Sequence, residues 1–119
     1  MSEQQSVELD AEDQKIITLA RSVRARNGVA EGAAVRDETG RTYVAGTVSL
    51  PSLHLSALQT AVAMAVASGA KGLEAAAVVG DANHLVDADL NAARDLGGAG
   101  TSVFLAGTDA VVRQTVVLD

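Results

Sequence analysis

The stretch GAAVRDETGRTYVAGTVS, residues 32–49, decides the fold of this 119-residue chain. It carries most of two β-prone runs, Val29 to Val35 and Arg41 to Val48, which flank the polar turn Asp37-Glu38-Thr39-Gly40. Two short apolar runs joined by a polar turn that ends in glycine are typical of a β-hairpin. The stretch therefore predicts a pair of neighbouring strands in the first half of the chain.

A helix is predicted on each side of this strand pair. The upstream helix starts at Asp10 and ends at Asn27-Gly28, and its apolar residues recur at helical spacing: Ile16, Leu19, Ala20 and Val23. Downstream, Pro51 ends the second strand, and Ser52 is a candidate N-cap for a helix over residues 53–67. This second helix is apolar nearly all round, which is typical of a helix buried on more than one side.

The remaining sequence predicts three more strands and a third helix. Residues 73–79 form a continuous apolar run, as expected of a central strand covered on both faces. Asp87 is a candidate cap for a helix over residues 87–96, and residues 101–106 and 111–118 are predicted to form an antiparallel hairpin. The element order α-β-β-α-β-α-β-β predicts an α/β fold. It has three layers, α/β/α, around a five-stranded mixed sheet, with the second and third helices linking strands that can lie parallel.

The composition indicates one globular domain. The chain is 48% hydrophobic and 20% charged, which excludes a disordered or low-complexity protein. Residues 1–9 are expected to form a flexible tail and residues 10–119 a single domain. Cysteine is absent, which excludes disulfides, cysteine–zinc sites and thiol nucleophiles.

Charge and hydropathy argue against nucleic acid and membranes, respectively, as partners. With 15 acidic and 9 basic residues the formal net charge is −6, so the surface repels phosphates and nucleic-acid binding is not expected. The clustered Arg21, Arg24 and Arg26 are expected on the solvated face and last turn of the first helix. No apolar run approaches the ~20 residues of a membrane span. The polar segment from Met1 to Asp13 is neither a signal nor a transit peptide, so a cytoplasmic protein is expected.

The chain has only two histidines, His54 and His84. A catalytic zinc ion needs three protein ligands and one open position. Together with Asp87, the two histidines could supply three ligands near the starts of the second and third helices. The competing interpretation is a pair of histidines in surface loops.

Three segments carry a resemblance to a known family. Residues 32–49, the segment Ser56-Ala57-Leu58-Gln59-Thr60-Ala61 and residues 75–81 resemble cytidine deaminases of the short, homo-oligomeric kind. In that family a Val-Gly-Ala-Ala strand, an acidic turn with glycine and a second strand lead to Asn-Val-Glu. A helix that is entered through Cys-Ala-Glu-Arg-Thr-Ala follows. The resemblance spans roughly residues 10–119 and implies the cytidine deaminase fold.

The resemblance also places the functional positions of the family on this chain. Its first zinc-binding cysteine falls on Ser56, and its catalytic glutamate falls on Leu58. The two cysteines of its Pro-Cys-x-x-Cys segment fall on Asp87 and Leu90. The asparagine and glutamate that hold the ribose fall on Thr47 and Ser49.

These replacements remove the chemistry of the family. Deamination needs a zinc-bound water, whose pKa falls from about 15.7 to about 7, and a carboxylate that carries the proton to the leaving ammonia. Leu58 cannot accept a proton, and Ser56 is a poor zinc ligand. The resemblance therefore predicts a protein without deaminase activity, zinc or another cofactor.

Several functions stay open at this stage. The leading hypothesis is a homodimer or homotetramer, or a module that binds an unidentified protein partner, because the apolar, alanine-rich second helix suits close subunit contact. A second hypothesis is a remodelled pocket that binds a nucleoside or another small polar molecule, lined by Thr47, Ser49, Ser56 and Asp87. Two enzymatic alternatives are an active cytidine deaminase, a hydrolase, and an enzyme with a different metal site at the two histidines and Asp87.

Overall fold

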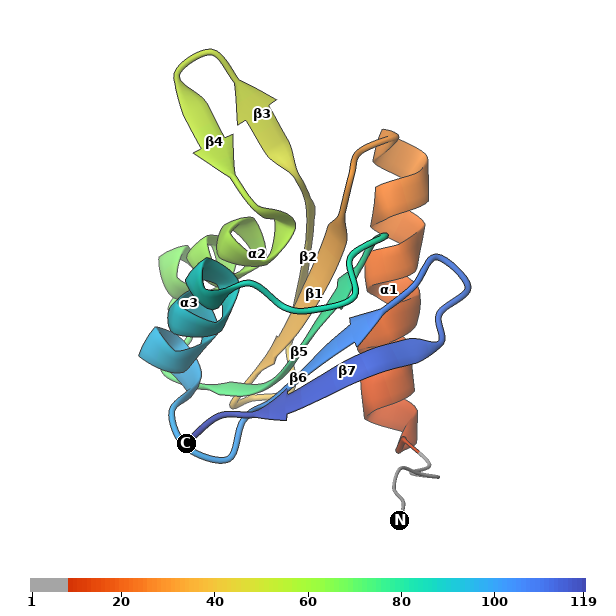
Figure 1. The fold of residues 1–119 in the computed structure, drawn as a ribbon. Coiled ribbons are helices and arrows are strands. Elements are labelled where there is room, and N and C mark those ends of the chain that lie inside the picture. Colours follow the sequence, from red (N-terminus) through yellow and green to blue (C-terminus); the bar gives the residue numbers. More distant parts are fainter. Residues whose placement is uncertain (1–8) are drawn as a thin grey trace.

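The structure, a computed structural model, describes residues 9–119, so the predicted tail lies outside the described residues except for Leu9. Three helices and seven strands follow one another along the chain (Figure 1). In order they are α1 (Ala11–Asn27), β1 (Gly32–Asp37), β2 (Thr42–Gly46), β3 (Val48–Leu50), β4 (Leu53–Leu55), α2 (Ala57–Ala67), β5 (Leu73–Val79), α3 (Asp87–Gly97), β6 (Ser102–Ala106) and β7 (Val112–Val117).

Five of the strands form one mixed sheet in the order β2-β1-β5-β6-β7. β5 and β6 are parallel, and the other neighbours are antiparallel. α1 covers one face of the sheet, and α2 and α3 cover the other (Figure 1). The predicted three-layer α/β fold and its five-stranded mixed sheet are therefore confirmed.

The connections agree with the prediction for one helix and differ in part for the other. α3 links the parallel neighbours β5 and β6. α2 leads to β5, which pairs with the antiparallel β1, whereas β2 is parallel to β5 but separated from it by β1.

Alternation along the central strands divides the core into two layers. Ala33 and Val35 of β1 pack in the cluster beneath α2, whereas Ala34 between them packs in the cluster beneath α1. This is the two-residue period of a strand whose faces are both covered. Alanine is frequent in these positions, so the helices can lie close to the sheet.

The turn between β1 and β2 forms as predicted around one buried carboxylate. Asp37 Oδ1 accepts hydrogen bonds from the backbone N–H of Thr39 and Arg41 and from the Thr39 hydroxyl, and Asp37 Oδ2 accepts one from the Tyr43 hydroxyl. The Thr39 hydroxyl is the main cause that holds the pKa of Asp37 below its usual range, and the other donors add to it. Gly40 adopts the left-handed conformation that closes the turn, with φ of 90°.

The predicted start of the second helix is wrong. Residues 48–55 form the short hairpin β3–β4, with Leu50 paired to Leu53 across the turn Pro51-Ser52. Apolar and polar residues alternate over most of this segment, and that period suits strands better than a helix. α2 begins only after Ser56, which replaces the predicted Ser52 as N-cap.

The ends of the other helices show one agreement and one difference. α1 is capped by Asp10, ends at Gly28 and carries Arg24 and Arg26 in its last turn, as predicted. Asp87 is not the cap of α3, because it is the first helical residue and the N-cap, Val86, makes no side-chain bond. Among the described residues, no helix combines the length and apolar character needed to cross a membrane.

α1 lies so close to β1 that there is no space for a side chain at Gly32, and this can be tested. A Cβ at this position would lie 2.9 Å from Val23 Cγ1 and would overlap the Ala20 carbonyl oxygen. We expect Gly32→Ala to lower the free energy of unfolding by about 1–3 kcal/mol, the usual cost of overpacking a core. Urea unfolding measures this change.

The matched control is Gly72→Ala, where the nearest atom to the new Cβ is Glu38 Cβ at 3.7 Å. This variant should stay within about 0.5 kcal/mol of the parent chain or be slightly more stable. Equal stability of the two alanine variants would contradict the close contact at Gly32.

Candidate functional site

The candidate site lies where the starts of α2 and α3 meet, and Ser56 is its centre. The Ser56 hydroxyl donates a hydrogen bond of 2.6 Å to Asp89 Oδ1 and accepts one of 3.0 Å from the Gln59 backbone N–H. In return, Gln59 Oε1 accepts the backbone N–H of Ser56 at 2.9 Å. This reciprocal arrangement is a capping box, in which the Ser56 hydroxyl is the acceptor. With its donor bond to Asp89, the hydroxyl is engaged both as donor and as acceptor within the chain.

Two acidic side chains gather at this site. Asp89, in the first turn of α3, is only 2% exposed. Burial raises the pKa of Asp89, and the hydrogen bond from Ser56 opposes that shift. Burial also raises the pKa of Glu31, and the neighbouring negative charge of Asp89 raises it further. The surroundings of both carboxyl groups therefore favour their protonated forms.

Thr47 supports Glu31 through the backbone. Its hydroxyl accepts the Glu31 N–H at 3.0 Å and lies 3.3 Å from the Glu31 carbonyl oxygen, which also accepts the Thr47 N–H at 3.1 Å. These contacts fix the segment that enters β1. The Thr47 hydroxyl is thus engaged within the chain.

Within residues 9–119, no hydrogen bond joins any two of the four predicted pocket residues. Thr47 and Ser56 use their hydroxyls within the chain, as described above. Ser49 is exposed on β3, with its Oγ 3.4 Å from Nδ1 of His54, and Asp87 is exposed on α3. Asp87 was the acidic residue predicted beside Ser56, but the one that hydrogen-bonds to Ser56 is Asp89.

Leu58, where the resemblance places the catalytic glutamate, is a core residue. It is 0% exposed and belongs to the cluster between α2 and the sheet. Leu90, which the resemblance places at a zinc-ligand position, is half-buried and packs against the same cluster. Both leucines contribute apolar packing to this part of the molecule.

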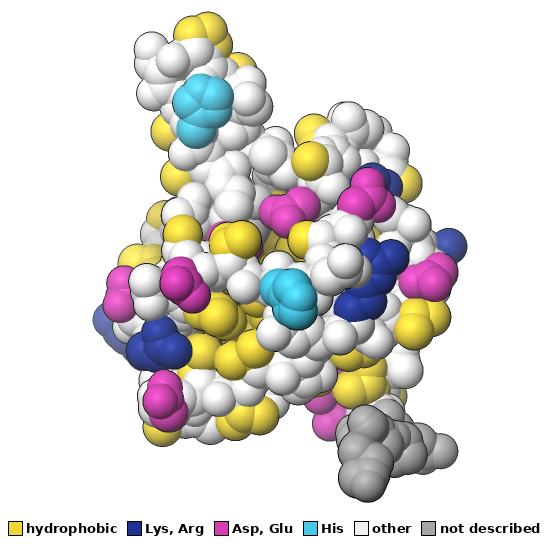
Figure 2. All heavy atoms as spheres, viewed as in Figure 1, with side chains coloured by type: hydrophobic (Ala, Val, Ile, Leu, Met, Phe, Trp, Pro, Cys, Tyr) yellow, Lys and Arg dark blue, Asp and Glu magenta, His cyan; other side chains and the backbone are white. Residues whose placement is uncertain are grey.

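The alternative metal site is not supported. Within residues 9–119, no group of three His, Cys, Asp or Glu side chains is arranged to hold a metal ion. His54 lies on β4 and His84 in the segment before α3, and the two histidine side chains are well apart on the face shown in Figure 2. His54, His84 and Asp87 are therefore not gathered as a metal-binding group in the described part of the chain.

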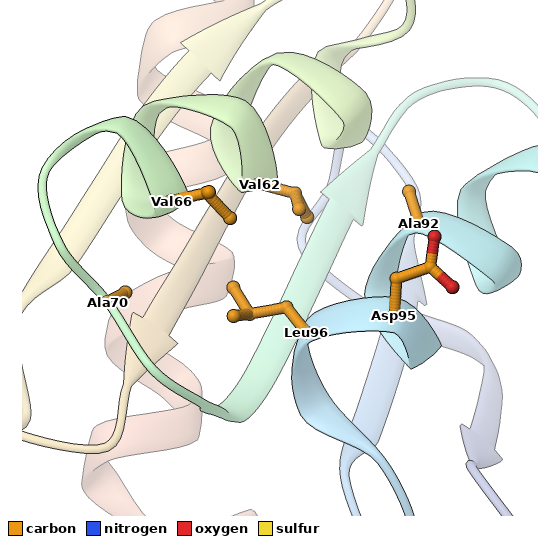
Figure 3. Close-up of a pocket in the computed structure, with 6 residues that line it drawn as sticks. All are labelled: Val62, Val66, Ala70, Ala92, Asp95 and Leu96. Atoms are coloured by element: carbon orange, nitrogen blue, oxygen red, sulfur yellow. The ribbon is translucent and has the colours of Figure 1, made fainter.

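A separate groove lies between α2 and α3 (Figure 3). It has a volume of about 400 Å³, and its lining is apolar except for one carboxylate: Val62, Val66, Ala70, Ala92, Asp95 and Leu96. Leu96 points toward the two valines, whereas Asp95 lies on the α3 side (Figure 3). The groove offers an apolar surface with a single hydrogen-bond acceptor at its edge.

Comparisons with known proteins agree on one family. The family model described as cytidine deaminase-like matches residues 9–110. The solved structure of cytidine deaminase from Burkholderia pseudomallei superposes with a TM-score of 0.75 at 23% identity, over 87% of this chain and 90% of that one.

Two mycobacterial structures give a similar result. Cytidine deaminase from Mycobacterium leprae has a TM-score of 0.70 at 23% identity, over 89% of this chain and 94% of that one. The enzyme from Mycobacterium tuberculosis has a TM-score of 0.68 at 22% identity, over 79% and 85%. No curated protein matches the chain. At these identities the structural similarity shows the fold.

The raised pKa values of Glu31 and Asp89 predict a dependence of stability on pH. A group whose pKa is higher in the folded chain stabilises the fold fully below its unfolded pKa, ~4 for these residues. That contribution is lost as the pH rises through the raised value. We expect the double variant Glu31→Gln/Asp89→Asn, which cannot titrate at either position, to gain more stability over the parent at pH 7 than at pH 5. Urea unfolding at both pH values measures the difference.

Asp87→Asn is the control, because it makes the same change in the same helical turn at an exposed residue. Its difference from the parent should be nearly the same at both pH values. If the double variant also shows a constant difference, Glu31 and Asp89 titrate as ordinary surface groups.

Proposed function

Since this chain belongs to the cytidine deaminase-like family, we propose that it uses the fold without the deaminase reaction and acts as a self-associating protein. Leu58 is the observation that carries this proposal. At the position where the resemblance places the proton-carrying glutamate, the chain has a fully buried hydrocarbon side chain. Deamination has to move a proton from the attacking water to the leaving ammonia, and Leu58 has no group that can do so.

The residues at the family's metal positions do not fit a zinc ion. Zinc in proteins is held by cysteine sulfur, histidine nitrogen or carboxylate oxygen, with three protein ligands in catalytic sites. The resemblance puts the other two ligands on Asp87 and Leu90, whereas the acid that Ser56 contacts is Asp89. If Asp89 served as a ligand instead, the Cys-x-x-Cys spacing would put the remaining ligand on Val86 or Ala92. Either assignment gives one neutral hydroxyl, one carboxylate and one hydrocarbon side chain, which is an inadequate donor set for zinc.

A long uncharged segment supports self-association. Residues 42–70 contain no Asp, Glu, Lys or Arg, although 20% of the whole chain is charged. This segment includes α2, on which Met64 and Val66 are exposed. The centres of protein interfaces are depleted of charged residues, and exposed apolar patches mark contact surfaces. A chain of net charge −6 can meet its own copy favourably only where like charges stay apart.

The first test of the proposal is catalytic. Purified protein incubated with cytidine and zinc should release ammonia no faster than buffer alone, and elemental analysis should find well below one zinc per chain. An active zinc-dependent cytidine deaminase in the same buffer is the positive control. Linear ammonia release in proportion to the protein concentration would overturn the assignment.

The second test is the mass of the protein in solution. Light scattering at micromolar concentration should give the mass of a dimer or tetramer, and Met64→Lys should shift the distribution toward monomer because it places a charge on the uncharged surface. Val111→Lys, at an exposed valine outside this surface, is the control and should leave the mass unchanged. A parent chain that is only monomeric would refute self-association.

A further inference from the structure

The β3–β4 hairpin has an apolar tip that the rest of residues 9–119 leaves about half exposed. Leu50 is 55% exposed and Leu53 is 48% exposed, and the two residues face each other in the register of the hairpin. The hairpin projects from the body of the molecule beyond the start of α2 (Figure 1). An isolated two-stranded hairpin is only marginally stable in water, so a contact at this tip would stabilise it.

The groove between α2 and α3 has matching chemistry. Its apolar lining suits leucine side chains, and a volume of about 400 Å³ lies in the range that accepts small ligands, roughly 300–1,000 Å³. The hairpin carries no Asp, Glu, Lys or Arg, so its tip adds no like charge beside Asp95. His54, next to the tip, provides an imidazole that can donate a hydrogen bond to a carboxylate such as Asp95.

The charge distribution favours a second copy of this chain as the partner. The hairpin and the α2 wall of the groove both lie within the uncharged segment 42–70. A contact between them therefore brings no acidic side chains of this segment together. The hairpin also lies on the same side of the sheet as α2 and α3 (Figure 1). In a dimer with a two-fold axis each copy presents the same surface to the other, so the hairpin–groove contact would occur twice.

We propose that the hairpin of each copy docks its tip, Leu50 and Leu53, in the α2–α3 groove of a second copy. This inference rests on the self-association proposed above and names the two surfaces that meet. The hairpin is the projecting element, and the groove is its receptor. The resulting interface is reciprocal and closes after two copies.

The first experiment removes the apolar tip without adding charge. Leu50→Ser/Leu53→Ser should weaken self-association at least about tenfold, measured by light scattering over a dilution series. Val111→Ser/Val117→Ser, at two valines on the surface near β7 that are each 60% exposed, is the matched control and should leave the association unchanged. Thermal unfolding of each variant verifies that the domain remains folded.

A cross-linking experiment tests the contact itself, and the absence of natural cysteine makes it specific. Leu53→Cys and Ala92→Cys are prepared as separate proteins, mixed and oxidised. A disulfide-linked pair with one chain of each kind is expected, because each cysteine then comes from a different copy. A mixture of Leu53→Cys with Val111→Cys should give no such enrichment.

The outcomes separate the two proposals. If the parent chain is monomeric, self-association fails, and the hairpin contact fails with it. If the parent associates but the serine variant associates equally well and no mixed disulfide forms, the hairpin contact is wrong and self-association stands. Loss of association in the serine variant together with the mixed disulfide supports the docking.

Discussion

The hydroxyl of Ser56 joins the starts of two helices, and the geometry of the candidate site follows from that contact. It caps α2 by accepting a hydrogen bond from the Gln59 N–H, and it donates a hydrogen bond to Asp89 in the first turn of α3. Removing such a donor from a buried carboxyl group lowers the free energy of unfolding by on the order of 1–3 kcal/mol. In the motif that residues 56–61 resemble, this position carries a metal ligand. Here a side-chain hydrogen bond connects the elements that a coordination bond connects in that motif, so the fold can keep the junction with no metal ion.

The neighbourhood of this junction is apolar on one side and acidic on the other. Leu58 continues the core from the sheet into α2, whereas Glu31 and Asp89 place two carboxyl groups in a partly desolvated space. On this apolar side, Leu58 has no proton-accepting group at the position where the resemblance places the glutamate. The acidic side holds groups that repel each other when ionised, so ionisation of both is unfavourable for the fold. The hydroxyls of Thr47 and Ser56 also have partners within the chain, which supports the proposal that this junction is structural.

Most of the fold could be predicted from the sequence, because strands with two covered faces and glycine-ended turns leave clear patterns. The β1–β2 turn, the apolar strand β5 and the final hairpin are of this kind. The β3–β4 hairpin was merged with the helix that follows, because its eight residues are uncharged and lead directly into an apolar helix, although their alternation is typical of strands. The sequence Ser56-x-x-Gln59 did carry a capping signal, whereas Ser52 had none three residues later. The candidate site was harder to predict than the fold. Ser56 was identified, but which acidic residue of the first α3 turn contacts it depends on how the helices pack. Glu31 lies just before β1, and no local sequence pattern marks it as part of the site.

The hydrogen bond between the Tyr43 hydroxyl and Asp37 Oδ2 has a practical consequence. The chain contains one tyrosine and no tryptophan, so its near-ultraviolet emission comes from a single phenol next to a carboxylate. A carboxylate that accepts a hydrogen bond from the phenol hydroxyl quenches tyrosine fluorescence, and opening of the β1–β2 turn breaks this hydrogen bond and relieves the quenching. The protein thus carries a label-free optical reporter of one defined turn.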